Sequence, residues 1–301
     1  MSLIQTTRAA DPETRIQSHI GVQLFTVREL LTQRFEQTLS ALAQMGYTEF
    51  EWFGFGSRLF IPDPLFGLTA SKLRQFLDRL GVVVPSVQFS GLTNEIPWLC
   101  DITRELGVHC VILGMAEEFL AETPRGPVVM GATGADQMRR LADRLNVIGA
   151  ECRRNGQEFA YHNHHMEFAS WAGETGFDIL VSGTDPALVR FELDLGWVKV
   201  AGYSGLEYLL RYPGRFVACH LKDFDPTLPQ PTPPGPIPEM TQLVPPGRGD
   251  QDFAKVLACM EATGVRHGYV EVDAAPDPLA ACRLALTYLK NLKLDAALAP
   301  P

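Results

Sequence analysis

The stretch YHNHHMEF, from Tyr161 to Phe168, places three histidines and one glutamate within eight residues. Imidazole nitrogens bind divalent metals and also exchange protons near neutral pH, and a carboxylate does either according to its surroundings. The stretch by itself therefore allows three interpretations: a metal site, an acid/base pair, or the end of a strand without a chemical function. Residues elsewhere in the chain must decide between them.

Other ionisable residues stand at the ends of further apolar segments. They are Glu51 in YTEFEWF, Glu192 and Asp194 in FELDLGW, His220, Lys222 and Asp223 in CHLKDFD, and Glu271 and Asp273 in VEVD. An isolated buried carboxylate is costly, and several that converge repel one another unless a cation lies among them. Oxygen and imidazole ligands without a thiolate suit Mn, Mg, Co or Zn. If these segments meet, they predict a divalent metal site.

The order of the elements predicts that they do meet. Eight apolar segments have the character of strands: 19–27, 47–55, 82–90, 109–115, 158–165, 189–197, 215–224 and 267–273. Amphipathic helical segments lie between them, for example 35–46, 69–81, 135–156 and 252–264. Eight such units in about 250 residues predict a single α/β domain, a (β/α)8 TIM barrel, whose strands direct their carboxyl ends toward one pocket. An open nucleotide-binding sheet has neither GxGxxG nor GxxxxGK[ST] to support it.

Domain boundaries follow from composition. Residues 1–18 are polar and are predicted to form a flexible lead-in, and residues 19–295 the barrel. The proline-rich segment 225–248 follows the seventh strand segment and is predicted to be a loop, because proline cannot donate a backbone hydrogen bond. It is either an exposed linker-like loop or a lid over the carboxyl-end pocket.

The overall composition limits partners and compartment. The chain has 301 residues and a formal net charge of -9, so neither nucleic acid nor a membrane surface is an expected partner. It opens without a secretory signal pattern and has no apolar run of the roughly 20 residues that a membrane span needs, so we expect a cytoplasmic protein. None of the six cysteines forms a CxxC pair, and we expect buried free thiols. A monomer and a homo-oligomer both stay open.

Five stretches together carry a resemblance to a known family: GVQLFTVRE, AYHNHHMEF, ELDLGWVKVAG, GRFVACHLKDF and GYVEVD. They resemble the sugar phosphate isomerase/epimerase family, which has a xylose-isomerase-like barrel, over nearly the whole barrel. The resemblance implies one divalent metal ion held by Glu, Asp, His and Glu from the last four strands.

Carried onto this chain, the resemblance implies the metal ligands Glu167, Asp194, His220 and Glu271. Relatives have the first of these glutamates in a different place, so His164 or His162 is an alternative to Glu167. Lys222 resembles the family lysine that lies beside the metal and contacts a substrate oxygen.

The substrate pocket departs from the family in three places. Gln88 stands where relatives often have a histidine, Gly196 precedes Trp197 where relatives often have a tyrosine, and the proline-rich loop is longer. We expect the substrate-binding residues to be Gln23, Glu51, His162 and Trp197. Phe25, Trp52, Phe53 and Trp197 either form an apolar wall for a sugar ring or pack in the core.

The resemblance implies proton abstraction next to the carbonyl of a sugar, keto-sugar or keto-inositol, through an enediolate that the metal stabilises. The expected catalytic residues are Glu271, Glu167, His164 and Lys222, with His164 as an alternative base. The expected enzyme is an isomerase or epimerase of carbohydrate metabolism. Loss of a β-hydroxyl after the same first step would make it a dehydratase or lyase, and the histidine-rich fifth strand also resembles keto-inositol dehydratases.

Two other classes of protein share this barrel. Abasic-site endonucleases use a trinuclear zinc cluster and a basic groove, but here the net charge is negative and no basic run flanks the pocket. A barrel that binds a sugar without turning it over is the second alternative. A Glu271→Gln variant separates that binding protein from a metal-dependent enzyme.

Overall fold

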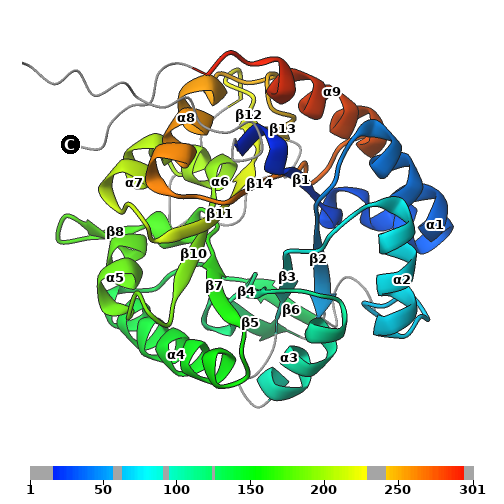
Figure 1. The fold of residues 1–301 in the computed structure, drawn as a ribbon. Helices are drawn as coiled ribbons and strands as arrows, with labels where there is room; N and C mark the ends of the chain where they lie inside the picture. The colour runs from blue at the N-terminus through cyan, green and yellow to red at the C-terminus, as the bar shows by residue number, and fades with distance from the viewer. Residues whose placement is uncertain (1–15, 57–62, 91–94, 124–125, 229–241, 295–301) are drawn as a thin grey trace, which may run out of the picture.

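The computed structural model describes residues 16–56, 63–90, 95–123, 126–228 and 242–294. Eight parallel strands close into a barrel with helices around it, which confirms the predicted (β/α)8 fold (Figure 1). Around the barrel the strands are β1 (Ile20–Gln23), β14 (His267–Val270), β11 (Phe216–Leu221), β10 (Arg190–Asp194), β7 (Glu158–His162), β4 (Cys110–Leu113), β3 (Ser86–Phe89) and β2 (Phe50–Phe55). Each lies within its predicted segment and is shorter than it.

The helices form the outer ring. They are α1 (Arg28–Met45), α2 (Ala70–Leu80), α3 (Ile96–Glu105), α4 (Ala135–Arg154), α5 (Gly176–Gly183), α6 (Leu195–Val200), α7 (Gly205–Arg211), α8 (Phe253–Thr263) and α9 (Pro278–Asn291). Local chemistry sets their ends. The Thr69 hydroxyl accepts from the amide of Lys72 at the start of α2, and Gly81 ends that helix with a φ of 69°. Glycine adopts this left-handed conformation without a steric penalty.

Short elements fill the connections. They are the 3-10 turns η2 (Ile16–His19), η3 (Leu24–Val27), η5 (Glu117–Phe119) and η6 (Met166–Phe168), and the antiparallel pairs β5 (Leu120–Thr123) with β6 (Gly126–Val129), β8 (Ser170–Trp171) with β9 (Glu174–Thr175), and β12 (Asp223–Phe224) with β13 (Leu243–Val244). The histidine-rich segment is divided by this arrangement, because β7 ends at His162 and residues 163–165 form the turn that leads into η6.

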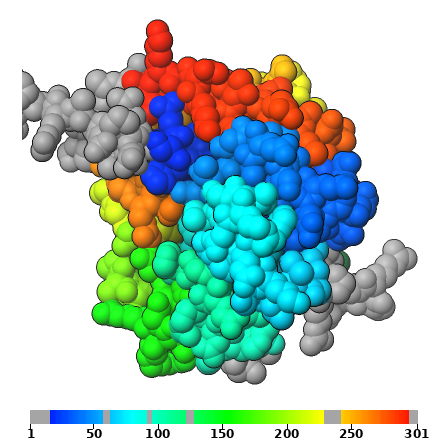
Figure 2. Space-filling model, turned by 45° about the vertical axis from the view of Figure 1, so that its right-hand side comes forward, coloured from blue at the N-terminus to red at the C-terminus, as the bar shows by residue number. Residues whose placement is uncertain are grey.

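The predicted lead-in, residues 1–18, lies outside the described residues up to residue 15. Its last residues are packed in η2. Ile16 is buried, its amide donates to Glu261 of α8, and the side chain of Gln17 donates to the carbonyl of Leu289 in α9. Figure 2 shows this dark blue turn against the orange and red C-terminal helices. This turn, the first element that the structure describes, is thus held against α8 and α9.

The central part of the predicted proline-rich loop, residues 229–241, also lies outside the described residues. The described residues that follow it, 247–251, are held by a buried carboxylate. Asp223 Oδ2 accepts from the amides of Gly247 and Gly249, and Asp223 Oδ1 accepts from the amide of Gln251. Asp223 therefore serves the loop, while its neighbour Lys222 faces the barrel interior.

The interior of the barrel holds few apolar side chains. Most of the core lies between the sheet and the helices, and a separate buried cluster consists of Cys110, Ile112, Ala160, Val217, Ala218 and Tyr269. Tyr269 occupies the middle of the barrel. Its hydroxyl lies 3.1 Å from the Ser86 hydroxyl, and its ring stacks on His267 at a centroid distance of 5.9 Å.

Two expectations from composition can be compared with the structure. All six cysteines are buried and unpaired, as predicted. Within the described ranges, no helix combines the length and the apolar character that crossing a membrane requires.

Candidate metal centre at the carboxyl end of the barrel

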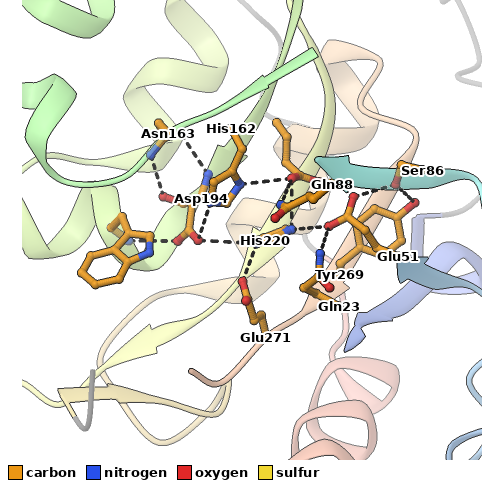
Figure 3. Close-up of polar contacts among 12 residues, drawn as sticks. Gln23, Glu51, Ser86, Gln88, His162, Asn163, Asp194, His220, Tyr269 and Glu271 are labelled. Carbon is orange, nitrogen blue, oxygen red and sulfur yellow. Dashed lines mark hydrogen bonds and ion pairs between the residues drawn. The ribbon is translucent and has the colours of Figure 1, made fainter. Parts of the chain in front are cut away.

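Three of the expected metal ligands meet at one point. Asp194 ends β10, His220 lies near the end of β11, and Glu271 directly follows β14. One ligand atom from each lies within 4.8 Å of the others, and all three side chains are buried. The strand register brings two of them together, because Asp194 of β10 is paired with His220 of β11. Figure 3 shows the three side chains converging from neighbouring strands.

The contacts inside this group have the geometry of converging ligands. His220 Nδ1 lies 2.6 Å from Glu271 Oε2 and 3.5 Å from Asp194 Oδ2. Among the described residues, neither His220 Nδ1 nor Asp194 Oδ2 has a hydrogen bond of acceptable geometry. Buried polar atoms normally have such partners. One imidazole nitrogen and two carboxylate oxygens, without a thiolate, form a donor set that fits a divalent cation.

His162 and Glu192 form a second group around the same histidine. His162 Nδ1 and His220 Nε2 each lie 3.1 Å from Glu192 Oε2, and His162 Nε2 lies 3.7 Å from Asp194 Oδ2. One ligand atom each from His162, Glu192 and His220 lies within 4.8 Å of the others. His162 therefore borders both groups and provides a further imidazole beside Asp194.

A buried polar network holds His220 from the other side. Glu51 Oε2 lies 2.6 Å from His220 Nε2 and accepts from the side chain of Gln23 at 2.7 Å, and Glu51 Oε1 accepts from the Ser86 hydroxyl at 2.6 Å. Gln88 donates to Glu192 at 2.9 Å. Figure 3 shows these contacts on the side of His220 away from Glu271. The network fixes the imidazole ring.

The charges in the centre shift its pKa values strongly. Burial alone would lower the pKa of His220, but Glu192, Glu271 and Glu51 raise it well above its ordinary value. Burial alone would raise the pKa of Glu271, yet Lys222 and His220 lower it to about 2. Burial alone would also raise the pKa values of Glu192 and Asp194, but His220 and Lys222 respectively hold them well below the ordinary range.

Two carboxyls of the centre shift in the opposite direction. Burial, and then the charge of Glu192, raises the pKa of Glu51 to about 8. Burial raises the pKa of Asp273 to about 6, because Lys222 only partly offsets it. The centre therefore contains carboxyls held ionised, one carboxyl, Glu51, held protonated at neutral pH, and one, Asp273, that takes up a proton near pH 6. Such divergent pKa values are typical of functional sites.

Lys222 is the ammonium group of the centre. Its Nζ lies 2.9 Å from Asp194 Oδ2, 2.8 Å from Glu271 Oε2 and 2.9 Å from Asp273 Oδ2. It also lies 5.4 Å from the centroid of the Trp197 ring, a favourable position for a cation. Burial lowers the pKa of Lys222, but the three carboxylates raise it well above its ordinary value.

His164 differs from the other histidines of the stretch. Its side chain is only half-buried, and its Nδ1 has no hydrogen-bond partner in the described part of the chain. Burial, followed by the charges of His162 and Lys222, lowers the pKa of His164 well below its ordinary value. The ring lies 5.0 Å from the His162 ring and 5.7 Å from the Trp197 ring. It is therefore a neutral imidazole beside the centre.

The structure places Glu167 apart from the other expected ligands. Its Oε1 accepts from the Tyr161 hydroxyl at 2.5 Å, and its Oε2 accepts from the backbone amide of His164 at 3.0 Å. Tyr161 belongs to the core outside the barrel, so η6 turns Glu167 away from the barrel axis. Burial raises its pKa to about 7. Among the described residues, no group of converging ligand atoms includes Glu167.

Comparison with known proteins now identifies the family. The family model of the xylose isomerase-like TIM barrel matches residues 39–292, well over half of the chain. The chain belongs to this family.

Individual proteins resemble the chain at low identity. An inosose dehydratase of Clostridium perfringens is 24% identical over 260 residues, which cover 81% of this chain and 83% of that protein. A sugar phosphate isomerase/epimerase structure from Parabacteroides distasonis has a TM-score of 0.71 at 20% identity, over 96% of this chain and 98% of the other. A xylose isomerase-like barrel from Mycobacterium smegmatis, solved in complex with magnesium, has a TM-score of 0.62 at 15% identity, over 90% and 95% of the two chains.

The expected substrate-binding residues of this xylose isomerase-like barrel lie in two settings. Gln23, Glu51 and His162 belong to the buried network around the centre, and Trp197 is buried beside Lys222. The other expected aromatic residues are divided. Trp52 packs in the outer core and donates its indole N–H to the carbonyl of Pro64, whereas Phe25 and Phe53 meet edge to face.

Sequence reasoning gave no role to several polar residues of the centre. Asn163 Oδ1 accepts from the amide of Asp194 and so fixes the turn after β10. Ser86 joins Glu51 to Tyr269. The signal for Ser86 is its position two residues before Gln88, which places both on the same face of β3.

Proposed function

We propose that this barrel is a divalent-metal-dependent enzyme that removes a proton next to the carbonyl of a cyclic keto-polyol, and that it eliminates water as a dehydratase. The observation that carries the proposal is the convergence of Asp194, His220 and Glu271 beside Lys222. A carbohydrate substrate follows from the enzyme family. The inosose dehydratase match, which covers most of both chains, favours elimination.

The proposed metal ligands differ from the expected set at one position. We assign Asp194, His220 and Glu271 as three ligands, and His162 in place of Glu167 as the fourth, because His162 Nε2 lies 3.7 Å from Asp194 Oδ2. When bound, a divalent ion supplies a Lewis acid that polarises the carbonyl and stabilises the negative charge of an enediolate.

His164 is the proposed base. Its imidazole is only partly buried, and its Nδ1 has no hydrogen-bond partner among the described residues. A neutral imidazole next to a substrate C–H accepts the proton and carries it as imidazolium. Glu271, expected from the sequence to share this role, lies against His220 and Lys222 and is better placed to hold the metal.

Lys222 is proposed to bind a substrate oxygen. Its ammonium group faces the centre and is held by Asp194, Glu271 and Asp273. Asp273, whose pKa is raised to about 6 by burial, is proposed as the proton donor beside Lys222. In an elimination, the base takes a proton from carbon and the donor protonates the departing hydroxyl.

Epimerisation is the second candidate. It uses the same first proton transfer and returns the proton to the other face of the carbon. The isomerase/epimerase description of the Parabacteroides distasonis structure, which spans nearly the whole chain, keeps this outcome in the test.

The experiment follows the proton and the product separately. The chelator-treated protein, reloaded with Mn²⁺, Mg²⁺, Co²⁺ or Zn²⁺, is incubated in D2O with inosose, or with a panel of ketoses and their phosphates, and followed by NMR. Deuterium at the carbon next to the carbonyl is expected, with loss of water for a dehydratase and a new epimer for an epimerase.

A histidine variant tests the assigned base. His164→Asn is expected to slow exchange by about 10²–10⁴-fold while the bound metal is unchanged. His109→Asn, an exposed histidine at the other end of the barrel, is the matched control. If no metal supports exchange with any compound of the panel, the proposed function is wrong. If His164→Asn exchanges at the wild-type rate, another group is the base.

A further inference from the structure

A second cluster of metal-binding side chains lies at the opposite, amino-terminal mouth of the barrel. His19 ends η2, Glu49 directly precedes β2, and His267 begins β14. His19 Nδ1 lies 2.8 Å from Glu49 Oε1, and His267 Nδ1 lies 2.7 Å from Glu49 Oε2. One ligand atom from each residue lies within 4.8 Å of the others. Three segments far apart in the sequence thus direct two imidazoles at one carboxylate.

The backbone of β1 passes very close to Glu49 of this cluster. Gly21 of β1 passes directly beside Glu49, and a Cβ added to Gly21 would lie 2.6 Å from the Glu49 carbonyl oxygen and 2.8 Å from Tyr269 Cδ1. Only glycine leaves room for both neighbours at this position. The turn that carries His19 is fixed by Ile16 and Gln17, which bond to α8 and α9.

The cluster opens onto a cavity of about 820 Å³. The exposed fraction of the side chain is 7% for Glu49, 23% for His267 and 41% for His19, so the carboxylate is inside and the imidazoles face the opening. The cavity is also lined by Arg74, His109, Arg153, Glu158 and Arg266. Two of these cations, Arg74 and Arg266, are paired with Asp78 and Glu158, which reduces their repulsion of a metal ion.

The middle of the barrel separates this cluster from the centre at the carboxyl end. Tyr269 stacks on His267 on one side and reaches Ser86 on the other, and the apolar cluster around Cys110 and Ile112 surrounds it. Ligands at the two ends therefore occupy separate spaces.

We propose that His19, Glu49 and His267 form a second metal site, which binds Zn²⁺ or a similar transition-metal ion. Two imidazole nitrogens and one carboxylate oxygen are three protein ligands, and the cavity side provides a fourth position for water or a small anion. Imidazole-rich sites prefer Zn²⁺, Co²⁺, Ni²⁺ and Cu²⁺ over Mg²⁺. To bind through Nδ1, each neutral imidazole carries its proton on Nε2. The ion links η2 to the starts of β2 and β14, so its binding stabilises the closed barrel.

The alternative is that Glu49 only accepts hydrogen bonds from the two imidazoles. Titration calorimetry of the full, chelator-treated chain with ZnCl2 separates the two, and Co²⁺ spectra in the visible range report the coordination. We expect two Zn²⁺ per wild-type chain. His267→Asn is expected to lose one of them, with affinity at that site reduced about 10²-fold or more.

Matched variants complete the test. His109→Asn lines the same cavity outside the cluster and should keep both ions. His19→Asn, at the most exposed ligand, tests the site with less risk to folding than His267→Asn. An unchanged zinc stoichiometry and Co²⁺ spectrum in His19→Asn and His267→Asn would overturn the second site. A His220→Asn variant should keep the Zn²⁺ that His267→Asn loses, so failure of the proposed function leaves this test intact.

Discussion

The two ends of this barrel use the same residue types in different proportions. The carboxyl end gathers five buried carboxyl groups, Glu51, Glu192, Asp194, Glu271 and Asp273, around Lys222, His162 and His220. The amino end holds one carboxylate, Glu49, between His19 and His267. The carboxyl end is therefore rich in acid and needs cations, whereas the amino end has two imidazoles for its single carboxylate.

Because of this difference, the carboxyl-end site depends on cations for its stability and the amino-end site does not. At the carboxyl end, burial opposes ionisation, and the cationic side chains keep Glu192, Asp194 and Glu271 ionised. Removing one cation leaves uncompensated buried charge, and a divalent ion relieves it. At the amino end, an imidazole nitrogen of His19 and one of His267 each lie within hydrogen-bond distance of the Glu49 carboxylate. Metal binding there should add stability without being needed for folding.

The largest expected effect is at the carboxyl end. Glu271→Gln removes one charge and one proposed ligand, so kcat/KM should fall by about 10³-fold and metal affinity should fall with it. Turnover and metal content of the purified variant measure both. The control is Glu174→Gln, an exposed glutamate of β9. Wild-type turnover in Glu271→Gln would contradict a metal-dependent enzyme and favour a barrel that only binds sugar.

Lys222→Met tests whether the carboxyl end depends on cations. The variant leaves Asp194, Glu271 and Asp273 without their shared ammonium group, and should lower the free energy of unfolding by about 3–5 kcal/mol in EDTA. Added Mn²⁺ should restore part of this loss. Urea unfolding with and without metal measures it, with Lys293→Met, an exposed lysine of the C-terminal segment, as control. Equal losses of unfolding free energy in Lys222→Met and Lys293→Met would mean that the carboxyl end does not depend on its cations.

Glu167 offers a buried carboxyl that belongs to neither end. Its pKa is raised from 4.5 to about 7, because burial outweighs its hydrogen bonds from Tyr161 and His164. The folded state then binds more protons than the unfolded state between these values. The stability that the protonated form provides is present below pH about 4.5 and is lost as the pH rises through about 7.

The expected loss from Glu167 over this window is about 3 kcal/mol. Glu167→Gln keeps an acceptor oxygen for the His164 amide and places its NH2 group beside the Tyr161 oxygen, which then accepts instead of donating, and the substitution should remove this pH dependence. Unfolding free energies measured from pH 4.5 to pH 8 for both proteins check the prediction. Parallel pH profiles would mean that the carboxyl is ionised throughout.

The sequence predicted the parts of the molecule that depend on strand order. Asp194, His220 and Glu271 stand at the carboxyl ends of strands, which parallel strands bring together, and the family resemblance selected them from the other ionisable residues at those ends. Glu167 could not be placed, because a turn after His162 decides its direction and the local pattern does not encode that turn. The cluster of His19, Glu49 and His267 was missed because these residues stand at strand beginnings, where sequence reasoning sought no chemistry.

The smallest effect concerns the wall between the two ends. Gly21→Ala would push a methyl group against Glu49 and Tyr269, and should cost about 1–3 kcal/mol of unfolding free energy. Gly134→Ala, where an added Cβ meets no atom within 4 Å, is the matched control. The added methyl group displaces Glu49 directly, so the zinc affinity of the amino-end site should fall in Gly21→Ala. The carboxyl-end ligands stand on β10, β11 and the segment after β14, so the metal affinity of that site should stay near wild type. An equal fall at both ends would mean that Tyr269 transmits strain along the barrel axis, and that the two sites are coupled through its ring.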